Sequence, residues 1–304
     1  MQTIDQLAAS FAIPGVLEFS EHNGLVRASI NTPACSGELY LQGAHVTAWQ
    51  PNDAHPVLFL SERSAFAPGK PIRGGIPIIS PWFGSRSATP EDPRTDGPSH
   101  GFARTQSWNL DFGAYAAEEL HLSLSLGPTD VSRSFGFDHF LLAYQITFGR
   151  DLRLRLSVAN DGEKPMRLEE ALHTYLHVGN VEQALVHGLF ETEYLDKTDN
   201  YARKTQTEPV LRFSGPTDRL YLNTASPIVV DDPVLGRHVA VTKSNSSTTV
   251  IWNPWANHGL ADLPVDGWRQ MLCVESANAA ESALHLQPSA AHVLETTISI
   301  EALS

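Results

Sequence analysis

Apolar and polar residues alternate along much of the chain. In the segment ELHLSLSL, residues 119–126, every second residue is leucine, and LRLRLSV at 152–158 repeats the pattern. A period of two is typical of β-strands that bury one face and expose the other. Polar turn clusters such as NDGEKP, DDPVLG and SNSST separate these segments, and no helical stretch is long enough for parallel βαβ units. The pattern therefore predicts an all-β protein, a large antiparallel β-sandwich.

The strand pattern continues through the middle of the chain without a linker, a composition shift or an internal repeat. We therefore expect residues 1–304 to form a single domain. One short helix is expected around Thr3 to Phe11. Residues 84–99, GSRSATPEDPRTDGPS, form a polar stretch rich in proline and glycine, and a loop of this length is typically functional or disordered.

The composition is that of an ordinary globular protein, with 42% apolar and 18% charged residues among 304. The formal net charge of -13 argues against nucleic acid or an anionic membrane as a partner, because both need a clustered basic surface. A small anionic ligand bound by a few local arginines is compatible with this charge. No run of about 20 apolar residues would cross a bilayer, and the N-terminal segment lacks the features of a secretion signal. We expect a cytoplasmic protein, and we take a monomer as its state.

Only two cysteines occur, Cys35 and Cys273, and they lie far apart in the sequence. Two thiols cannot form a metal site alone or the framework of a disulfide-rich secreted fold. We expect both to be reduced and buried.

The segment MRLEEALHTYLHVGN contains two histidines, His173 and His177. In a strand, both would lie with Tyr175 on one face. The opposite face would then be apolar apart from one threonine, with Leu172, Thr174, Leu176 and Val178. In a helix, the two histidines would form an i, i+4 pair as in zinc proteases, but the glutamate after the first histidine and a third ligand are missing. We therefore predict no metal site, and a core histidine with satisfied hydrogen bonds is the alternative to a functional one.

The segment WRQMLCVESANA places a carboxylate at the end of an apolar strand. Leu272 and Val274 are expected to face the core, and Cys273 and Glu275 the opposite side. Burial raises the pKa of a carboxyl group and a nearby cation lowers it, so such a glutamate can be tuned as a general base. A structural ion pair is the alternative interpretation.

Two segments on either side of the long polar loop contain candidate ligand-binding residues. In GKPIRGGIPIISPWFG, Arg73 precedes two glycines that let the backbone approach a ligand closely. Trp82 and Phe83 offer flat faces on which a sugar ring can pack. In PSHGFARTQSWNL, the loop ends with His100 and Arg104. The alternative is a turn with a solvated arginine and core aromatics.

Six segments, in their order along the chain, resemble those of the hexose-6-phosphate mutarotases, the glucose-6-phosphate 1-epimerase branch of the aldose 1-epimerase family. The segments are KPIRGGIPIISPWFG, HGFAR, ALHTYLHVGN, ETEYLDK followed by TDRLYLN, VIWNPW, and MLCVESANA. Together they extend over most of the chain. The resemblance implies a galactose-mutarotase-type sandwich with its site on the concave face of one sheet, which agrees with the strand pattern.

The resemblance also assigns roles to individual residues. It implies that His173 and Glu275 transfer protons, that Arg73 and Arg104 contact a sugar phosphate, and that Asp218 contacts sugar hydroxyls. The implied reaction is interconversion of the α and β anomers of a hexose 6-phosphate, with Glu275 as base and protonated His173 as acid. It needs no metal and no cofactor, and its only partner is the small sugar phosphate.

Two positions depart from this pattern or are less specific. Ser99 stands before HGFAR, where some relatives carry a glutamine that contacts substrate. His100 resembles a substrate-binding histidine of the broader aldose epimerases. Two other functions share the same features: an aldose 1-epimerase for unphosphorylated sugars, and a non-catalytic carbohydrate-binding or sensing protein.

Overall fold

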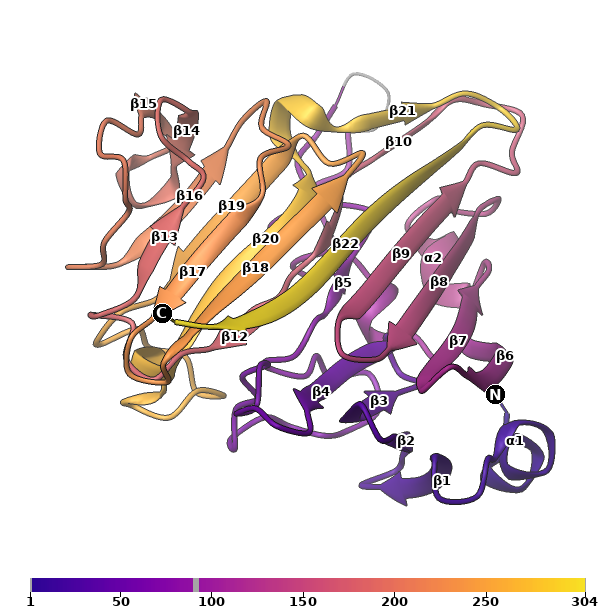
Figure 1. The fold of residues 1–304 in the computed structure, drawn as a ribbon. Coiled ribbons are helices and arrows are strands. Elements are labelled where there is room, and N and C mark those ends of the chain that lie inside the picture. The colour runs from indigo at the N-terminus through magenta and orange to yellow at the C-terminus, as the bar shows by residue number, and fades with distance from the viewer. Residues whose placement is uncertain (1, 90–92, 304) are drawn as a thin grey trace.

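The computed structural model describes residues 2–89 and 93–303. In this part of the chain, two large sheets of eight strands each form the architecture (Figure 1). We call the first the β20 sheet, and its strand order is β15-β14-β16-β19-β20-β11-β5, with β12 also paired to β20. Its strands are β5 (Ile78–Ile79), β11 (Glu170–Leu172), β12 (Tyr175–His177), β14 (Glu193–Asp196), β15 (Ala202–Thr205), β16 (Thr217–Tyr221), β19 (Thr248–Asn253) and β20 (Met271–Asn278).

We call the second the β22 sheet, and its strand order is β13-β17-β18-β22-β9-β8-β7-β6. Its strands are β6 (Asn109–Ala116), β7 (Glu119–Leu126), β8 (Leu141–Phe148), β9 (Leu152–Ala159), β13 (Leu185–His187), β17 (Ile228–Asp232), β18 (Arg237–Ser244) and β22 (Ala291–Ala302). Neighbouring strands run antiparallel in both sheets. The predicted all-β antiparallel fold is confirmed.

Smaller elements complete the fold. A four-stranded sheet contains β1 (Leu17–His22), β2 (Leu25–Asn31), β3 (Cys35–Tyr40) and β4 (His45–Pro51), and β10 (Met166–Leu168) pairs with β21 (Leu284–Leu286). The helices are α1 (Ile4–Phe11), α2 (Asp130–Ser134) and the 3₁₀ turns η1 (Ala103–Thr105), η2 (Lys197–Asp199), η3 (Gly267–Gln270) and η4 (Ala280–Ser282). The predicted N-terminal helix is confirmed, and Thr3 begins it with a capping box. No helix in the described ranges is long and apolar enough to span a membrane.

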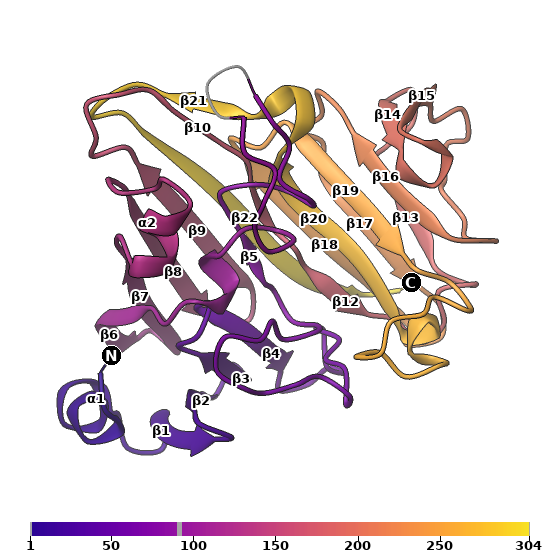
Figure 2. The same cartoon turned by 180° about the vertical axis from the view of Figure 1, so that it is seen from behind.

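The two large sheets form layers, as the opposite views of Figures 1 and 2 show, and the main hydrophobic cluster joins residues of both of them with residues of the four-stranded sheet and of α1. The alternating leucines of β7 and β9 are buried, as the pattern predicted, while the residues between them are half-buried or exposed. One continuous cluster joins these leucines to Leu172, Leu272 and Val274 of the β20 sheet. Residues on the opposite face of that sheet, such as Tyr175 and Cys273, are not part of this cluster. Cys35 and Cys273 are both buried and free, as expected.

Strand register brings the two predicted proton-transfer residues together. Strands β11 and β12 both pair with β20, with Leu172 opposite Ser276 and Tyr175 opposite Cys273. The register is the same on both sides of the short gap between β11 and β12. His173 lies in that gap and is therefore opposite Glu275.

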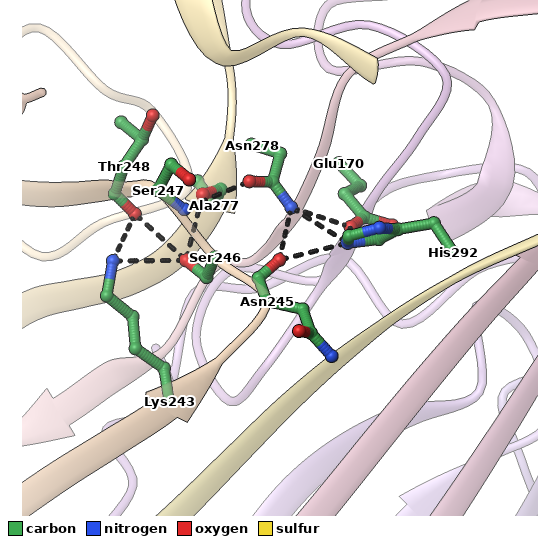
Figure 3. A network of polar contacts seen from close by, with 9 residues as sticks. All are labelled: Glu170, Lys243, Asn245, Ser246, Ser247, Thr248, Ala277, Asn278 and His292. Atoms are coloured by element: carbon green, nitrogen blue, oxygen red, sulfur yellow. Dashed lines mark hydrogen bonds and ion pairs between the residues drawn. The ribbon is translucent and has the colours of Figure 1, made fainter. Parts of the chain in front are cut away.

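A polar network secures the far end of the same strand pair (Figure 3). Glu170 lies opposite Asn278 in the sheet, and the Asn278 amide donates a hydrogen bond of 3.0 Å to the Glu170 carboxylate. The same carboxylate lies 3.2 Å from Nε2 of His292 on β22. Nearby, Lys243 Nζ donates to the Ser246 hydroxyl at 3.0 Å and to the Thr248 carbonyl at 2.8 Å. These contacts link β11 and β20 to the second sheet.

Candidate active site

His173 and Glu275 form a buried pair on the face of the β20 sheet that points away from the main core. Nε2 of His173 lies 3.4 Å from Oε1 of Glu275, and the residues are 6% and 1% exposed. Nδ1 of His173 and Oε2 of Glu275 are buried and have no hydrogen-bond partner within residues 2–89 and 93–303. Each group therefore has one polar atom that no hydrogen bond in the described ranges satisfies.

Strand alternation explains why these side chains are not in the core. Leu272 and Val274 belong to the main core cluster, whereas Cys273 belongs to a separate cluster with Tyr175, so the predicted facing is confirmed. The strand interpretation of the histidine segment is also confirmed, which removes the helical zinc-protease alternative. His177 has different neighbours at the end of β12: the charges that act on it come from Arg237, Asp232 and His55, and not from Arg73 or Arg104.

Two aromatic residues surround the imidazole. The Tyr175 ring stacks on the His173 ring with centroids 4.7 Å apart and an interplanar angle of 9°. Trp252 lies perpendicular to both rings, with centroids 6.0 Å away. The sequence placed Tyr175 on the same face as His173 without giving it a role, and Trp252 appeared only within the VIWNPW segment.

Burial drives both members of the pair toward their neutral forms. It raises the pKa of Glu275 well above its ordinary value, and the negative charge of Asp218 adds to this rise. It lowers the pKa of His173 well below its ordinary value, and positive charges on neighbouring residues, including Arg104 and Arg73, lower it further. Because the two groups lie 3.4 Å apart, a proton gained or lost by one of them changes the proton affinity of the other.

Arg73 and Arg104 bring positive charge to the pair. Arg73 Nε donates to Asp262 at 3.1 Å, and Nη1 donates to the Tyr175 hydroxyl at 3.0 Å. Arg104 Nη2 donates to the Ser99 carbonyl at 2.7 Å, while its Nε is buried without a partner. Within the described ranges, no carboxylate lies in ion-pair distance of Arg104. Its guanidinium is therefore not held in an ion pair within these ranges, which suits it to an anionic ligand.

The glycines after Arg73 allow the chain to pass close to its neighbours. Gly74 and Gly75 have φ angles of 114° and 62°, and an added Cβ would lie 2.4 Å from the Phe59 carbonyl oxygen and 2.3 Å from that of Val46. Only glycine fits such contacts with a positive φ. This tight loop fixes Arg73 beside β12.

The ring of His100 lies beside that of His173. Its ring centroid is 5.6 Å from that of His173 and 4.9 Å from that of Phe83, and its Nδ1 accepts a 3.3 Å hydrogen bond from the Gly84 amide. Burial, followed by the positive charge of Arg104, lowers the pKa of His100 to about 3. The ring is therefore neutral at ordinary pH. Residues 90–92 of the predicted loop at 84–99 lie outside the described residues.

Asp218 forms an ion pair on the same sheet face. Its carboxylate lies 2.9 Å from Lys197 Nζ, and both side chains are about one-fifth exposed, at 21% and 22%. Asp218 is opposite Trp252 in the β16–β19 pairing, and Lys197 lies 5.6 Å from the centre of the Phe83 ring. Burial raises the pKa of Asp218, while Lys197 opposes this rise. Lys197 was not singled out by the sequence, because a lysine in a short 3₁₀ turn has no distinctive pattern.

Trp82 does not lie with these residues. It is 4% exposed, its indole donates to the Pro98 carbonyl, and its ring packs edge-on against Phe102 and Phe135. Its neighbour Phe83 lies at the site instead. The two rings thus lie in different surroundings, and only that of Phe83 packs against His100.

Cys273 completes a set of three potential metal ligands, which the sequence did not reveal. The donor atoms of His173, Cys273 and Glu275 all lie within 4.8 Å of one another. The positive charges of Arg73 and Arg104 oppose a cation here, and Nδ1 of His173 lacks the acceptor that usually orients a ligating imidazole. Burial also raises the pKa of the Cys273 thiol well above its ordinary value. The arrangement therefore suits proton transfer better than metal binding.

A model of the family described as aldose 1-epimerase matches residues 27–299. The chain belongs to the aldose 1-epimerase family. Over 269 residues it is 30% identical to an Escherichia coli K12 protein named "Putative glucose-6-phosphate 1-epimerase", and the match covers 88% of each chain. The chain described here also shares 28% identity and a TM-score of 0.88 with the crystal structure of the Salmonella typhimurium "putative mutarotase (YeaD)", over 96% of each of the two chains.

A galactose mutarotase-like protein from Clostridium acetobutylicum shares the fold at 13% identity, with a TM-score of 0.69 over 94% of this chain and 98% of that one. The sandwich type that the resemblance implied is confirmed. The chain is therefore an epimerase that interconverts the anomers of a sugar.

Proposed function

We propose that this epimerase interconverts the α and β anomers of a hexose 6-phosphate, and that glucose 6-phosphate is its substrate. The observation that carries the proposal is the position of two guanidinium groups, those of Arg104 and Arg73, beside the His173–Glu275 pair, where the side chain of Arg104, within the described ranges, donates to a carbonyl and not to a carboxylate. The name of the Escherichia coli relative supports the same substrate. An acidic protein can bind an anionic sugar in this way, because charge-assisted contacts act locally.

The chemistry needs one group to remove a proton and another to supply one. A base removes the proton of the C1 hydroxyl while an acid protonates the ring oxygen. The bond between C1 and the ring oxygen breaks, a carbonyl forms at C1, and rotation about C1–C2 presents the other face. Ring closure returns both protons. We assign the base to Glu275 and the acid to protonated His173, and neither step needs an added reactant.

The phosphate can prepare the pair for this role. Burial by itself favours a neutral imidazole and a protonated carboxyl group. The active form, with the proton on His173, holds the same number of protons and differs only in the position of one. A phosphate dianion on Arg73 and Arg104 offsets the charges that lower the pKa of His173, and so favours the imidazolium.

Other residues of this sheet face would hold the sugar. Trp252 and Phe83 present aromatic faces to a ring, and the Asp218–Lys197 pair offers an acceptor and a donor to hydroxyl groups. Trp82 has no part in this arrangement.

Exchange between anomers, followed by NMR, tests the proposal. Glu275→Gln and His173→Asn should each abolish the acceleration while the fold is retained. Arg104→Met should lower kcat/KM for glucose 6-phosphate by about 10- to 100-fold, as expected for a lost charge-assisted contact, and change the value for glucose much less. Arg133→Met is the matched control, since this arginine pairs with Asp130 on α2. Equal losses on both sugars with Arg104→Met would refute phosphate recognition.

A further inference from the structure

Tyr175 contacts both functional parts of the site. Its ring lies against the imidazole of His173, and its hydroxyl accepts a hydrogen bond from Arg73. It is 2% exposed, its backbone amide donates to the Gly75 carbonyl, and its carbonyl accepts from the Phe59 amide. The residue is therefore held firmly between the candidate proton-transfer pair and the anion-binding arginine.

The orientation of the imidazole depends on packing. In many acid–base sites, a hydrogen bond to the second ring nitrogen holds the imidazole in place. Nδ1 of His173 has no such partner among the described residues. The parallel Tyr175 ring at 4.7 Å and the edge-on rings of His100 and Trp252 surround the imidazole. Among these three, only the Tyr175 ring is stacked on the imidazole plane and restricts its tilting directly.

The hydroxyl group restricts Arg73 in a similar way. The guanidinium donates from Nε to Asp262 and from Nη1 to Tyr175, and Nη2 lies 3.1 Å from the same aspartate oxygen. These contacts hold the guanidinium from two directions. Since a guanidinium has five N–H donors, an anion can still be bound by those left over. Burial raises the pKa of the Tyr175 phenol, so this hydroxyl is neutral when it accepts the bond.

We propose that Tyr175 is a positioning residue that couples anion binding at Arg73 to the orientation of the His173 imidazole. The inference rests on the proposed function, because the anion is taken to be the substrate phosphate. Movement of Arg73 toward a phosphate is transmitted through the hydroxyl to the ring that supports the imidazole. Two contacts of one side chain thus serve two different steps, substrate binding and proton transfer.

The two contacts can be separated by substitution. Tyr175→Phe keeps the stacked ring and removes the hydroxyl. It should raise KM for glucose 6-phosphate by about 2- to 10-fold and also lower kcat for this sugar, because anion binding at Arg73 no longer reaches the ring that supports the imidazole. Both constants for glucose should change much less. Tyr144→Phe is the matched control, since Tyr144 is completely buried in the main core and its hydroxyl has no partner in the described ranges. A KM rise of equal size for both sugars would overturn the link to Arg73.

Tyr175→Leu removes the ring itself. It should lower kcat for both sugars by at least about 10-fold and alter the pH profile of kcat, because the imidazole is no longer held in one plane. A folded variant, verified by circular dichroism, with unchanged kcat and pH profile would overturn the positioning role. Should this variant not fold, the Tyr175→Phe comparison decides by itself.

A measurement without turnover separates this inference from the proposed function. Inorganic phosphate is titrated into the protein while the ¹⁵N resonances of the His173 ring are recorded. We expect a shift in the wild type and in Tyr144→Phe, and a smaller shift in Tyr175→Phe at saturating phosphate, where only the direct effect of the phosphate charge on the imidazole remains. An equal shift in Tyr175→Phe, or no shift in the wild type, refutes the coupling. Absence of glucose 6-phosphate exchange in the wild type would instead refute the proposed function.

Discussion

At the scale of single residues, burial determines the chemistry of the site. His173 and Glu275 are nearly inaccessible, and each is driven toward its neutral form. A single proton can then occupy either group without a change in total charge. This property suits a reaction in which protons are exchanged with the sugar in both directions. Cys273 lies beside the pair and its thiol stays protonated, so it adds no charge that would disturb this balance.

The pair predicts a bell-shaped pH profile for kcat/KM. On the acidic limb of the profile, the pair takes up a second proton at His173 and loses activity. Because the pKa of His173 is lowered, this limb lies below about pH 6.5. On the basic limb, the pair loses the one proton that it shares in the active form. Because the pKa of Glu275 is raised, this limb lies well above pH 4.5. Glucose is the substrate of choice for this measurement, because it does not ionise between these limits.

Asp218→Asn tests this pH profile, because it should shift the basic limb in a known direction. The negative charge of Asp218 raises the pKa of Glu275, so its removal should move the basic limb to lower pH. The height of the curve is also expected to fall, since Asp218 contacts the sugar in our proposal. Asp130→Asn, on the exposed surface of α2, should leave both limbs in place. A basic limb that stays in place in Asp218→Asn would exclude Glu275 as the titrating group.

At the scale of elements, strand register produces the site. His173 lies in a gap between β11 and β12, and it meets Glu275 only because both strands keep one register with β20. A shift of one residue would turn either side chain into the core. The polar network at the far end of β11, built on Glu170 and Asn278, opposes such a shift.

His292 gives this network a pH-dependent strength. The hydrogen bond to Glu170 raises the pKa of His292, although burial opposes the rise. A raised pKa means that the stabilisation is fully present below about pH 6.5, the unfolded-state pKa, and is lost as the pH rises through the folded-state pKa. His292→Gln should therefore lower the free energy of unfolding by about 2 kcal/mol at pH 6 and by much less at pH 9. Urea unfolding at both pH values measures the difference.

The matched control for this prediction is His285→Gln, since His285 is exposed on the neighbouring strand β21. It should change stability little at either pH. A loss in His292→Gln that is the same at pH 6 and pH 9 would mean that the ion pair with Glu170 does not stabilise the protein.

The elements differ in how far the sequence alone could predict them. The leucines of β7 and β9 alternate, and the facing of Leu272 and Glu275 follows from the same period, because a strand needs only local information. The meeting of His173 and Glu275 depends on pairing between residues about 100 apart, which no local pattern specifies. Trp82 shows the limit most clearly, since alternation separates it from Phe83 but does not tell which ring faces the site. Asp262 comes from an irregular loop and had no sequence signal.

At the scale of the whole molecule, one core and one site are both assembled from distant parts of the chain. The main hydrophobic cluster includes residues from Leu7 in α1 to Ile298 in β22. The site takes Arg73, Arg104 and Glu275 from segments that are separated by long stretches of sequence. Neither the core nor the site can therefore persist when one half of the chain unfolds.

This arrangement predicts that residues 1–304 unfold in a single transition, as a single domain would. Circular dichroism and tryptophan fluorescence should report the same midpoint, because both large sheets share the cluster. Inorganic phosphate at 100 times its dissociation constant, as determined by calorimetry, should stabilise the folded state by about 2.7 kcal/mol. For a protein of this size, Tm should rise by about 5 °C. Arg104→Met should unfold in the same way without the phosphate-dependent rise. Two transitions, of which phosphate moves only one, would show instead that the site belongs to a separate domain and that the shared core does not unite the chain.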